Sequence, residues 1–222
     1  MADLIFYTNP QSRGRIVRWM LEEVGQPYET DVIPYDQMKS ERYLAIHPLG
    51  KVPAIKHNGH ILTECAAICT FLADVFPEAM LGPRADEKAD YYRWLFYAAG
   101  PLEAAISNQA MGWVPPPERE RMFGYGNFER AIAAVDEMLS LRDYVCGDRF
   151  TAADVYLGSQ LMFPMQFGML PARDSFLRYR DRLQQRPAYN RANEIDEKLS
   201  DELGLRPPQP AQPAQPAQPA PA

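Results

Sequence analysis

Apolar and polar positions near the start of the chain follow first a strand pattern and then a helix pattern. Residues 4–7 form a short apolar run that ends at Thr8-Asn9-Pro10, which predicts a strand passing into a loop. Apolar residues at positions 16, 17, 20, 21 and 24 then recur at helical spacing before Gly25, where we expect the helix to end. Residues 28–33 predict a second strand. Because one helix joins the two strands, they are predicted to be parallel.

The next segment has the pattern of a hairpin followed by a helix. Residues 40–46 predict a short helix, and residues 52–56 and 60–62 predict two strands. Asn58-Gly59 between them is the dipeptide most typical of a two-residue hairpin turn. Residues 64–75 place their larger apolar side chains on one side of a predicted helix. The order βαβ and then ββα is that of a thioredoxin-like domain.

Strand patterns are absent beyond residue 77, and long helical patterns replace them. Pro77, Gly82 and Pro83 mark a loop, so we place an interdomain linker there. Helices are predicted over residues 86–111, 118–141, 152–168, 175–185 and 189–203. Pro164 is expected to kink or end the third of them.

The expected fold class is therefore an α/β thioredoxin-like N-terminal domain followed by an all-α helical C-terminal domain. We assign residues 1–80 to the first domain and residues 81–205 to the second. After Arg206, the rest of residues 206–222 consists of Pro, Ala and Gln, and this segment is predicted to form a disordered tail because it offers no large apolar side chain to bury.

One predicted helix has a distinct start signal. Thr151 and Asp154 have the spacing of a capping box, in which each residue satisfies a backbone N–H of the other. Phe150 precedes the cap, where an apolar side chain can act as a hydrophobic staple. The pattern predicts a stable helix start, with a structural role.

Composition narrows the possible functions. The 222 residues carry a formal net charge of −6, which argues against the basic surface that a nucleic-acid-binding protein needs. Three cysteines without paired spacing make no disulfide framework, so a reducing compartment is expected. No apolar run approaches the roughly 20 residues of a membrane span, and the first residues lack the order of a signal peptide. We expect a cytoplasmic protein that binds neither nucleic acid nor membrane.

The hairpin and the helix after it have the features of a small-molecule binding edge. Pro53 cannot donate to a sheet, and it leaves the Val52 backbone available for a ligand. Glu64 and Cys65 lie at the start of a predicted helix, where backbone N–H groups are unpaired. These N–H groups suit a carboxylate and Glu64 suits an amine, which together predict a site for a zwitterionic peptide.

Taken together, these motifs resemble a known family. The loop that contains Ser12, the Val52-Pro53 turn, the Glu64-Cys65 helix start and the Thr151 to Asp154 box occur in the order seen in cytosolic glutathione transferases of bacterial type. The resemblance covers residues 3–203. It implies a glutathione-binding thioredoxin-like domain, a helical domain that binds a hydrophobic small-molecule electrophile, a cis peptide bond before Pro53, and a homodimer.

The chemistry that the resemblance implies is attack by the glutathione thiolate. A free thiol has a pKa of about 8.5, so the enzyme must stabilise the sulfur anion. Ser12 matches the serine of serine-type transferases, and a hydroxyl at a helix N-terminus can donate a hydrogen bond to the thiolate. Tyr7 is the second candidate, because other classes of the family carry a catalytic tyrosine near the end of the first strand. A plain helix cap remains the alternative role for Ser12.

The resemblance also assigns the glutathione contacts. Val52, beside Pro53, pairs with the backbone of the cysteinyl part, while Glu64 binds the γ-glutamyl amine. Cys65 stands where the family usually has a serine. Its backbone N–H remains available for the γ-glutamyl carboxylate, but its side chain is only a weak donor. Lys51 is placed to meet the glycyl carboxylate, or it is simply an exposed lysine.

The cysteines raise two further expectations. Cys65 lies near a helix N-terminus, which predicts a lowered pKa and reactivity toward oxidation or glutathione. Cys65 and Cys69 share a helix face, but no nearby His or Cys completes a tetrahedral set, so no metal is expected.

The electrophile pocket is expected between the Ser12 loop and the helix that starts near residue 86. Aromatic and thioether side chains available to it are Tyr91, Tyr92, Trp94, Tyr97, Met111, Trp113, Phe163 and Phe167.

Two alternatives to a conjugating transferase stay open. One is a non-catalytic module with the same fold that binds glutathione or a protein partner. The other is a glutathione-dependent isomerase. Thiol exchange is disfavoured, because position 12 is not a cysteine and the chain has no Cys-x-x-Cys motif.

Overall fold

The N-terminal part of the molecule is built on a four-stranded mixed sheet. The structure is a computed structural model that describes residues 3–205. The strands are β1 (Leu4–Thr8), β2 (Glu29–Val32), β3 (Ala54–His57) and β4 (His60–Thr63), in the order β2-β1-β3-β4. β1 pairs parallel with β2 and antiparallel with β3, and β3 pairs antiparallel with β4. The predicted βαβ and ββα units are confirmed.

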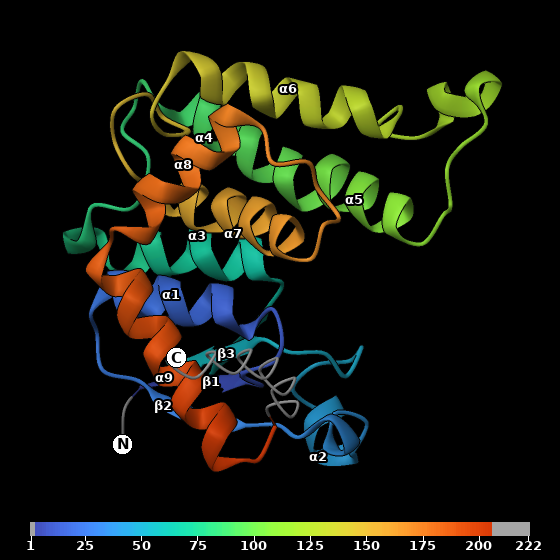
Figure 1. The fold of residues 1–222 in the computed structure, drawn as a ribbon. Coiled ribbons are helices and arrows are strands. Elements are labelled where there is room, and N and C mark those ends of the chain that lie inside the picture. The colour runs from blue at the N-terminus through green and yellow to red at the C-terminus, as the bar shows by residue number, and fades with distance from the viewer. Residues whose placement is uncertain (1–2, 206–222) are drawn as a thin grey trace, which may run out of the picture.

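Helices cover both faces of this sheet. On one face lie α1 (Gly14–Val24) and α3 (Cys65–Val75), and α2 (Glu41–Leu44) lies on the other (Figure 1). The alternation of β1 explains the two layers. Phe6 packs in the large core shared with α1 and α3, whereas Tyr7 packs against Tyr43 of α2. Short 3₁₀ turns at Tyr35–Gln37 and Pro77–Ala79 complete this part.

The rest of the described chain is helical, as predicted. Its elements are α4 (Lys88–Tyr97), a π-helical turn η3 (Ala98–Leu102), α5 (Glu103–Ala110), the 3₁₀ turn η4 (Pro117–Met122), α6 (Phe128–Leu141), α7 (Ala152–Gln166), α8 (Asp174–Gln184) and α9 (Pro187–Glu202). Figure 1 shows α4 to α7 stacked beyond α3, with α9 returning along α1 toward the sheet.

Two predicted helices differ from those observed. The helix expected over residues 86–111 is divided by η3, because Pro101 has no N–H for a regular α-helical bond. The helix expected over residues 118–141 begins only at Phe128, where Asn127 caps it by accepting from the N–H of Arg130. Pro164 lies inside α7, two residues before the helix ends at Gln166.

Asp154 is the polar centre of the helical layer. The predicted capping box is present, and the fully buried Asp154 carboxylate accepts hydrogen bonds from the N–H of Thr151 at 2.8 Å and that of Val145 at 2.7 Å. The hydroxyls of Thr151 and Tyr179 donate to it at 3.0 Å and 2.8 Å. Burial raises the pKa of Asp154 to about 6, while these four donors favour its ionised form.

Arg149 ties the segment between α3 and α4, predicted above as a linker, to the helical layer. Its guanidinium donates to the carbonyl oxygens of Met80 at 2.6 Å and Gly82 at 2.8 Å, and it forms a two-pronged ion pair with Glu87. The hydrogen bond from Arg149 lowers the pKa of Glu87 to about 2, from an ordinary value of 4.5. The course of the linker is therefore fixed by one charged contact.

We expect Asp154→Ala to lower the free energy of unfolding by about 2 kcal/mol or more, because it leaves buried donors without an acceptor. Urea unfolding followed by circular dichroism measures the change. Asp148→Ala is the matched control, since this carboxylate lies exposed in the preceding loop. Equal stability of the two variants would contradict the role assigned to Asp154.

The Arg149–Glu87 pair predicts an acid-sensitive contribution to stability. Because the folded pKa of Glu87 is depressed, the contribution is full above about pH 4.5 and is lost as the pH falls toward about 2. Between neutral pH and about pH 3, Glu87→Gln should therefore lose less unfolding free energy than the unaltered protein. Urea titrations at the two pH values test this, and parallel losses in both proteins would refute it.

Candidate active site

Ser12 lies in the tight loop between β1 and α1. Its hydroxyl donates to the carbonyl oxygen of Asn9 at 2.6 Å and accepts from the N–H of Gly14 at 2.9 Å. The helix begins at Gly14 with Arg13 at the N-cap position, so the prediction that Ser12 is the N-cap was wrong by one residue. Ser12 nevertheless remains bound to the first N–H of the helix.

Gly14 permits this tight entry into α1. A Cβ atom added to it would lie 1.9 Å from Oγ1 of Thr8 and 3.1 Å from Oγ of Ser12. Thr8 is fully buried at the end of β1. The close approach of strand and helix therefore needs a residue without a side chain at position 14.

The hairpin edge has the expected backbone geometry. The peptide bond between Val52 and Pro53 is cis, as predicted. Pro53 is buried, Val52 is half-buried and the Lys51 side chain is exposed. The hydroxyl of Tyr43 donates to the carbonyl oxygen of Lys51 at 2.6 Å, which anchors the turn to α2.

The start of α3 meets the Ser12 loop. The thiol of Cys65 donates to the carbonyl oxygen of Arg13 at 3.7 Å, which links the two segments directly. Glu64 has a φ of +69°, a left-handed value uncommon for a residue with a side chain and often found at functional sites. Residues 12 and 64–65, far apart in the sequence, thus lie at one place.

The expected activation of Cys65 was wrong. Burial raises the pKa of its thiol to about 12, although the charge of Arg13 acts in the opposite direction. The desolvation of the sulfur outweighs its position at the helix start. The thiol of Cys65 is therefore protonated at neutral pH, and Cys69 is fully buried in the core.

Tyr7 lies on the other side of the sheet from α1. It is buried among Ile33, Met38, Tyr43 and Ala54, and its ring centroid is 6.3 Å from that of Tyr43. Burial raises the pKa of its hydroxyl. Tyr7 therefore packs in the layer beneath α2, whereas Ser12 lies at the end of α1.

A cavity of about 830 Å³ opens beside Ser12, between α1, α5, α7, α8 and α9. At its Ser12 end, the guanidinium of Arg13 pairs with Glu103 at 2.5 Å. The hydroxyl of Tyr156 donates to Glu103 at 3.2 Å and accepts from Gln160 at 3.0 Å. This polar group was missed in the sequence, because Glu103 and Gln160 reach the cavity only through the packing of α5 and α7.

Most of the aromatic and thioether residues expected around the pocket lie elsewhere in the structure. Of that set, only Phe163 lines the cavity. Tyr91 and Trp94 are buried in the core, while Trp113 and Met111 are 67% and 62% exposed beyond α5. The apolar lining comes from α1, α5, α7, α8, α9 and the loop before α8.

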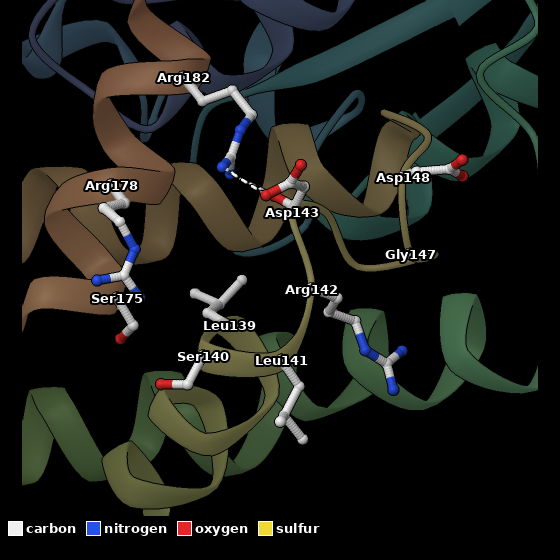
Figure 2. A pocket seen from close by; sticks show the side chains of 10 residues that line it. All are labelled: Leu139, Ser140, Leu141, Arg142, Asp143, Gly147, Asp148, Ser175, Arg178 and Arg182. Carbon is white, nitrogen blue, oxygen red and sulfur yellow. Dashed lines mark hydrogen bonds and ion pairs between the residues drawn. The ribbon is translucent and has the colours of Figure 1, made fainter.

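A second cavity lies on another part of the helical layer. It has a volume of about 460 Å³ between the end of α6, the following loop and α8. Figure 2 shows its polar lining, in which Arg182 is ion-paired with Asp143. Arg142 is paired with Asp90. None of the residues with predicted chemistry lines this cavity.

No helix within residues 3–205 is long and apolar enough to cross a membrane. Over the same range, His, Cys, Asp and Glu form no group of three that could hold a metal ion.

Comparison with known proteins agrees with this arrangement. Residues 12–75 match the family model described as glutathione S-transferase, N-terminal domain. The chain is 29% identical over 195 residues to glutathione S-transferase GstA of Escherichia coli O157:H7, covering 84% of this chain and 92% of that protein. Residues 12–75 therefore form a glutathione S-transferase N-terminal domain.

Two further relatives of the chain are an isomerase and a transferase whose structure was solved with glutathione bound. Maleylacetoacetate isomerase of Pseudomonas aeruginosa is 28% identical, with 70% of this chain and 76% of that protein covered. The theta-class glutathione S-transferase of Xanthomonas axonopodis pv. citri, solved with glutathione bound, is 25% identical with a TM-score of 0.68. That comparison covers 86% of this chain and 97% of the solved chain.

We expect Gly14→Ala to destabilise the protein by about 1 to 3 kcal/mol, because the new methyl group overlaps the Thr8 hydroxyl. Combining it with Thr8→Ala should recover part of the loss. Gly100→Ala is the matched control, because nothing lies within 4 Å of the added atom. Thermal melting of all four proteins checks this, and a neutral Gly14→Ala would show that the loop is not held as described.

Proposed function

We propose that this protein is a glutathione transferase that joins the glutathione sulfur to a small hydrophobic electrophile. The observation that carries the proposal is the meeting of Ser12, the Glu64-Cys65 helix start and the cavity. Cys65 touches the backbone of the Ser12 loop, and Ser12 itself lines the cavity. A thiol bound at this junction faces a space that can hold a second molecule.

Glutathione would bind along the sheet edge. The backbone of Val52, beside Pro53, would pair with the cysteinyl part, and Glu64 would hold the γ-glutamyl amine. The N–H groups at the start of α3 would bind the γ-glutamyl carboxylate, with Cys65 supplying its backbone N–H. The exposed Lys51 is placed to meet the glycyl carboxylate. The likeness to glutathione-bound relatives supports this placement.

Ser12 would stabilise the thiolate. Its hydroxyl now donates to Asn9, so on binding it would turn from that oxygen to the sulfur, while the N–H of Gly14 still holds its oxygen. A charge-assisted hydrogen bond favours the anion and lowers the thiol pKa. The thiolate then forms a bond to the electrophilic carbon, and the displaced electron pair leaves with a group or takes up a proton. Tyr7, beneath α2, is the second candidate.

The domain roles, the oligomeric state and the location that we propose follow from the resemblance to the family. Residues 1–80 would form the glutathione domain and residues 81–205 the substrate domain. We propose a homodimer in the cytoplasm that needs no metal and binds neither nucleic acid nor membrane. The predicted tail at residues 206–222 lies outside the described residues.

A glutathione-dependent isomerase is the second candidate, and the maleylacetoacetate isomerase relative favours it. An isomerase would add the same thiolate and release it again after rotation about a bond. A non-catalytic glutathione-binding module is the third, motivated by the replacement of the usual serine by Cys65. Glutathione calorimetry together with an assay of conjugation to an aromatic halide separates the three candidates.

The proposal predicts that Ser12→Ala lowers the conjugation rate roughly a hundredfold and raises the pKa of bound glutathione. Ser107→Ala is the matched control, because this serine also lines the cavity but comes from α5. The pH dependence of kcat/KM, with thiolate absorbance of the binary complex, measures both effects. A full rate in Ser12→Ala and a loss in Tyr7→Phe would transfer the role to Tyr7.

A further inference from the structure

A tight turn at residues 47–50 leads from α2 to the hairpin edge at residues 51–53. The N–H of Gly50 donates to the carbonyl oxygen of His47 at 2.7 Å, which closes the turn. Gly50 has a φ of +55°, and a Cβ atom on it would overlap the carbonyl oxygen of Met38. The turn therefore lies close against the segment before α2, and the hairpin edge follows directly after it.

The imidazole of His47 completes this turn from inside the protein. Its Nδ1 accepts from the N–H of Leu49 at 3.3 Å, as the side-chain oxygen of an Asn or Asp accepts from the N–H two residues on in an Asx turn. Accepting at Nδ1 requires the neutral imidazole, with its proton on Nε2. The residue is only 4% exposed, and its ring stacks on that of Tyr43 with centroids 6.5 Å apart. His47 therefore holds the turn only while it is uncharged.

Further bonds connect this turn to the hairpin edge. The hydroxyl of Tyr43 donates to the carbonyl oxygen of Lys51 at 2.6 Å, and the ammonium group of Lys39 donates to the carbonyl oxygen of Leu49, also at 2.6 Å. Val52 packs in the same apolar cluster as Tyr43. The imidazole, the tyrosine hydroxyl and the ammonium group thus hold three consecutive residues of backbone. A change at the imidazole is therefore transmitted to the backbone of Val52 over a few covalent bonds.

The surroundings of His47 keep it neutral at pH 7. Burial lowers the pKa of its imidazole below the ordinary value of 6.5, although the carboxylate of Glu64 and a bond to its own backbone act in the opposite direction. The ammonium groups of Lys39 and Lys51 lower this pKa further. The hydroxyl of Tyr43 stays protonated, because burial raises its pKa. A proton added to the imidazole would therefore place a cation near two ammonium groups and one carboxylate.

We propose that His47 is a positioning residue for the hairpin edge, which its neutral imidazole holds in the shape that binds glutathione and its protonated form releases. The inference rests on the proposed function, because that function supplies the ligand. Protonation turns Nδ1 into a donor, so the bond from the N–H of Leu49 is lost. The imidazolium also attracts the carboxylate of Glu64, for which it competes with the amine of the ligand.

The direction of the pH effect follows from the lowered pKa of His47. The neutral imidazole contributes fully above about pH 6.5, and its contribution is lost as the pH falls through the lowered pKa. Glutathione should therefore bind less tightly in mild acid. Because coupling is reciprocal, bound glutathione should in turn lower the pKa of His47 further.

The test is glutathione calorimetry on the full chain between about pH 7 and about pH 5.5, where the carboxylates and the amine of glutathione keep their charges. The Kd of the unaltered protein should rise about three- to tenfold over this range, since one unit of pKa difference between the free and bound states is a tenfold change. His47→Asn keeps an acceptor for the N–H of Leu49 but does not titrate, so its Kd should change less than about twofold. His47→Leu lacks the acceptor and should bind weakly at both pH values. His60→Asn is the matched control, because this histidine is exposed at the start of β4, and it should behave as the unaltered protein does.

A second measurement without ligand separates this proposal from the proposed function. In an NMR titration, the amide shifts of Leu49 and Val52 should follow the titration of the His47 imidazole, and they should not do so in His47→Asn. Shifts that ignore the imidazole, or an equal pH dependence of Kd in the unaltered protein and His47→Asn, would overturn the positioning role and leave the transferase function. Shifts that follow the imidazole in a protein that binds no glutathione at any pH would overturn the proposed function, and the positioning role with it.

Discussion

The buried ion pair between Arg18 of α1 and Asp196 of α9 joins the last helix of the chain to the first. Both side chains are almost completely buried, 3.2 Å apart, and Arg18 also donates to Tyr28 and Thr30. Burial raises the pKa of Asp196, while the charge of Arg18 opposes this effect. Two charges removed from water need each other, since loss of one partner typically costs about 3 to 5 kcal/mol. This demand fixes the register of α9 along α1, and two more exposed pairs, Arg186–Glu23 and Arg191–Glu22, follow that register toward the start of α9.

That register determines the shape of the site. Helix α1 carries Ser12 just before its first turn, and α9 places Asn193 and Tyr189 along the same helix. The sheet fixes the other boundary, because β3 and β4 deliver Glu64 and Cys65 to the Ser12 loop. The helical layer then closes the cavity through Glu103 and Phe163. The hairpin edge and the cavity therefore share the short loop around Ser12, which lies where the two layers meet.

Two polar centres hold the helical layer to this frame. Asp154 collects donors from the loop before α7 and from α8, and Arg149 fastens the linker through Glu87. Each gathers several backbone or side-chain groups on one charge in a largely buried setting, where hydrogen bonds are stronger than in water. Hydrogen bonds of fixed geometry also specify how the helices are oriented, whereas apolar contacts alone restrict that orientation less. The cavity walls from α7 and α8 inherit that orientation.

The sequence by itself determined the order of strands and helices, the hairpin at Asn58-Gly59 and the capping box at Thr151. These are local signals, because each depends on neighbours within a few positions. Local signals failed where a proline or a tight turn competed with a helical pattern, as at Pro101, residues 118–127 and Ser12. Only the tertiary structure decided the pKa of Cys65, the place of Tyr7 beneath α2 and the lining of the cavity. Desolvation, ion pairing across helices and cavity shape depend on residues far apart in the chain, and no spacing along the sequence records those distances.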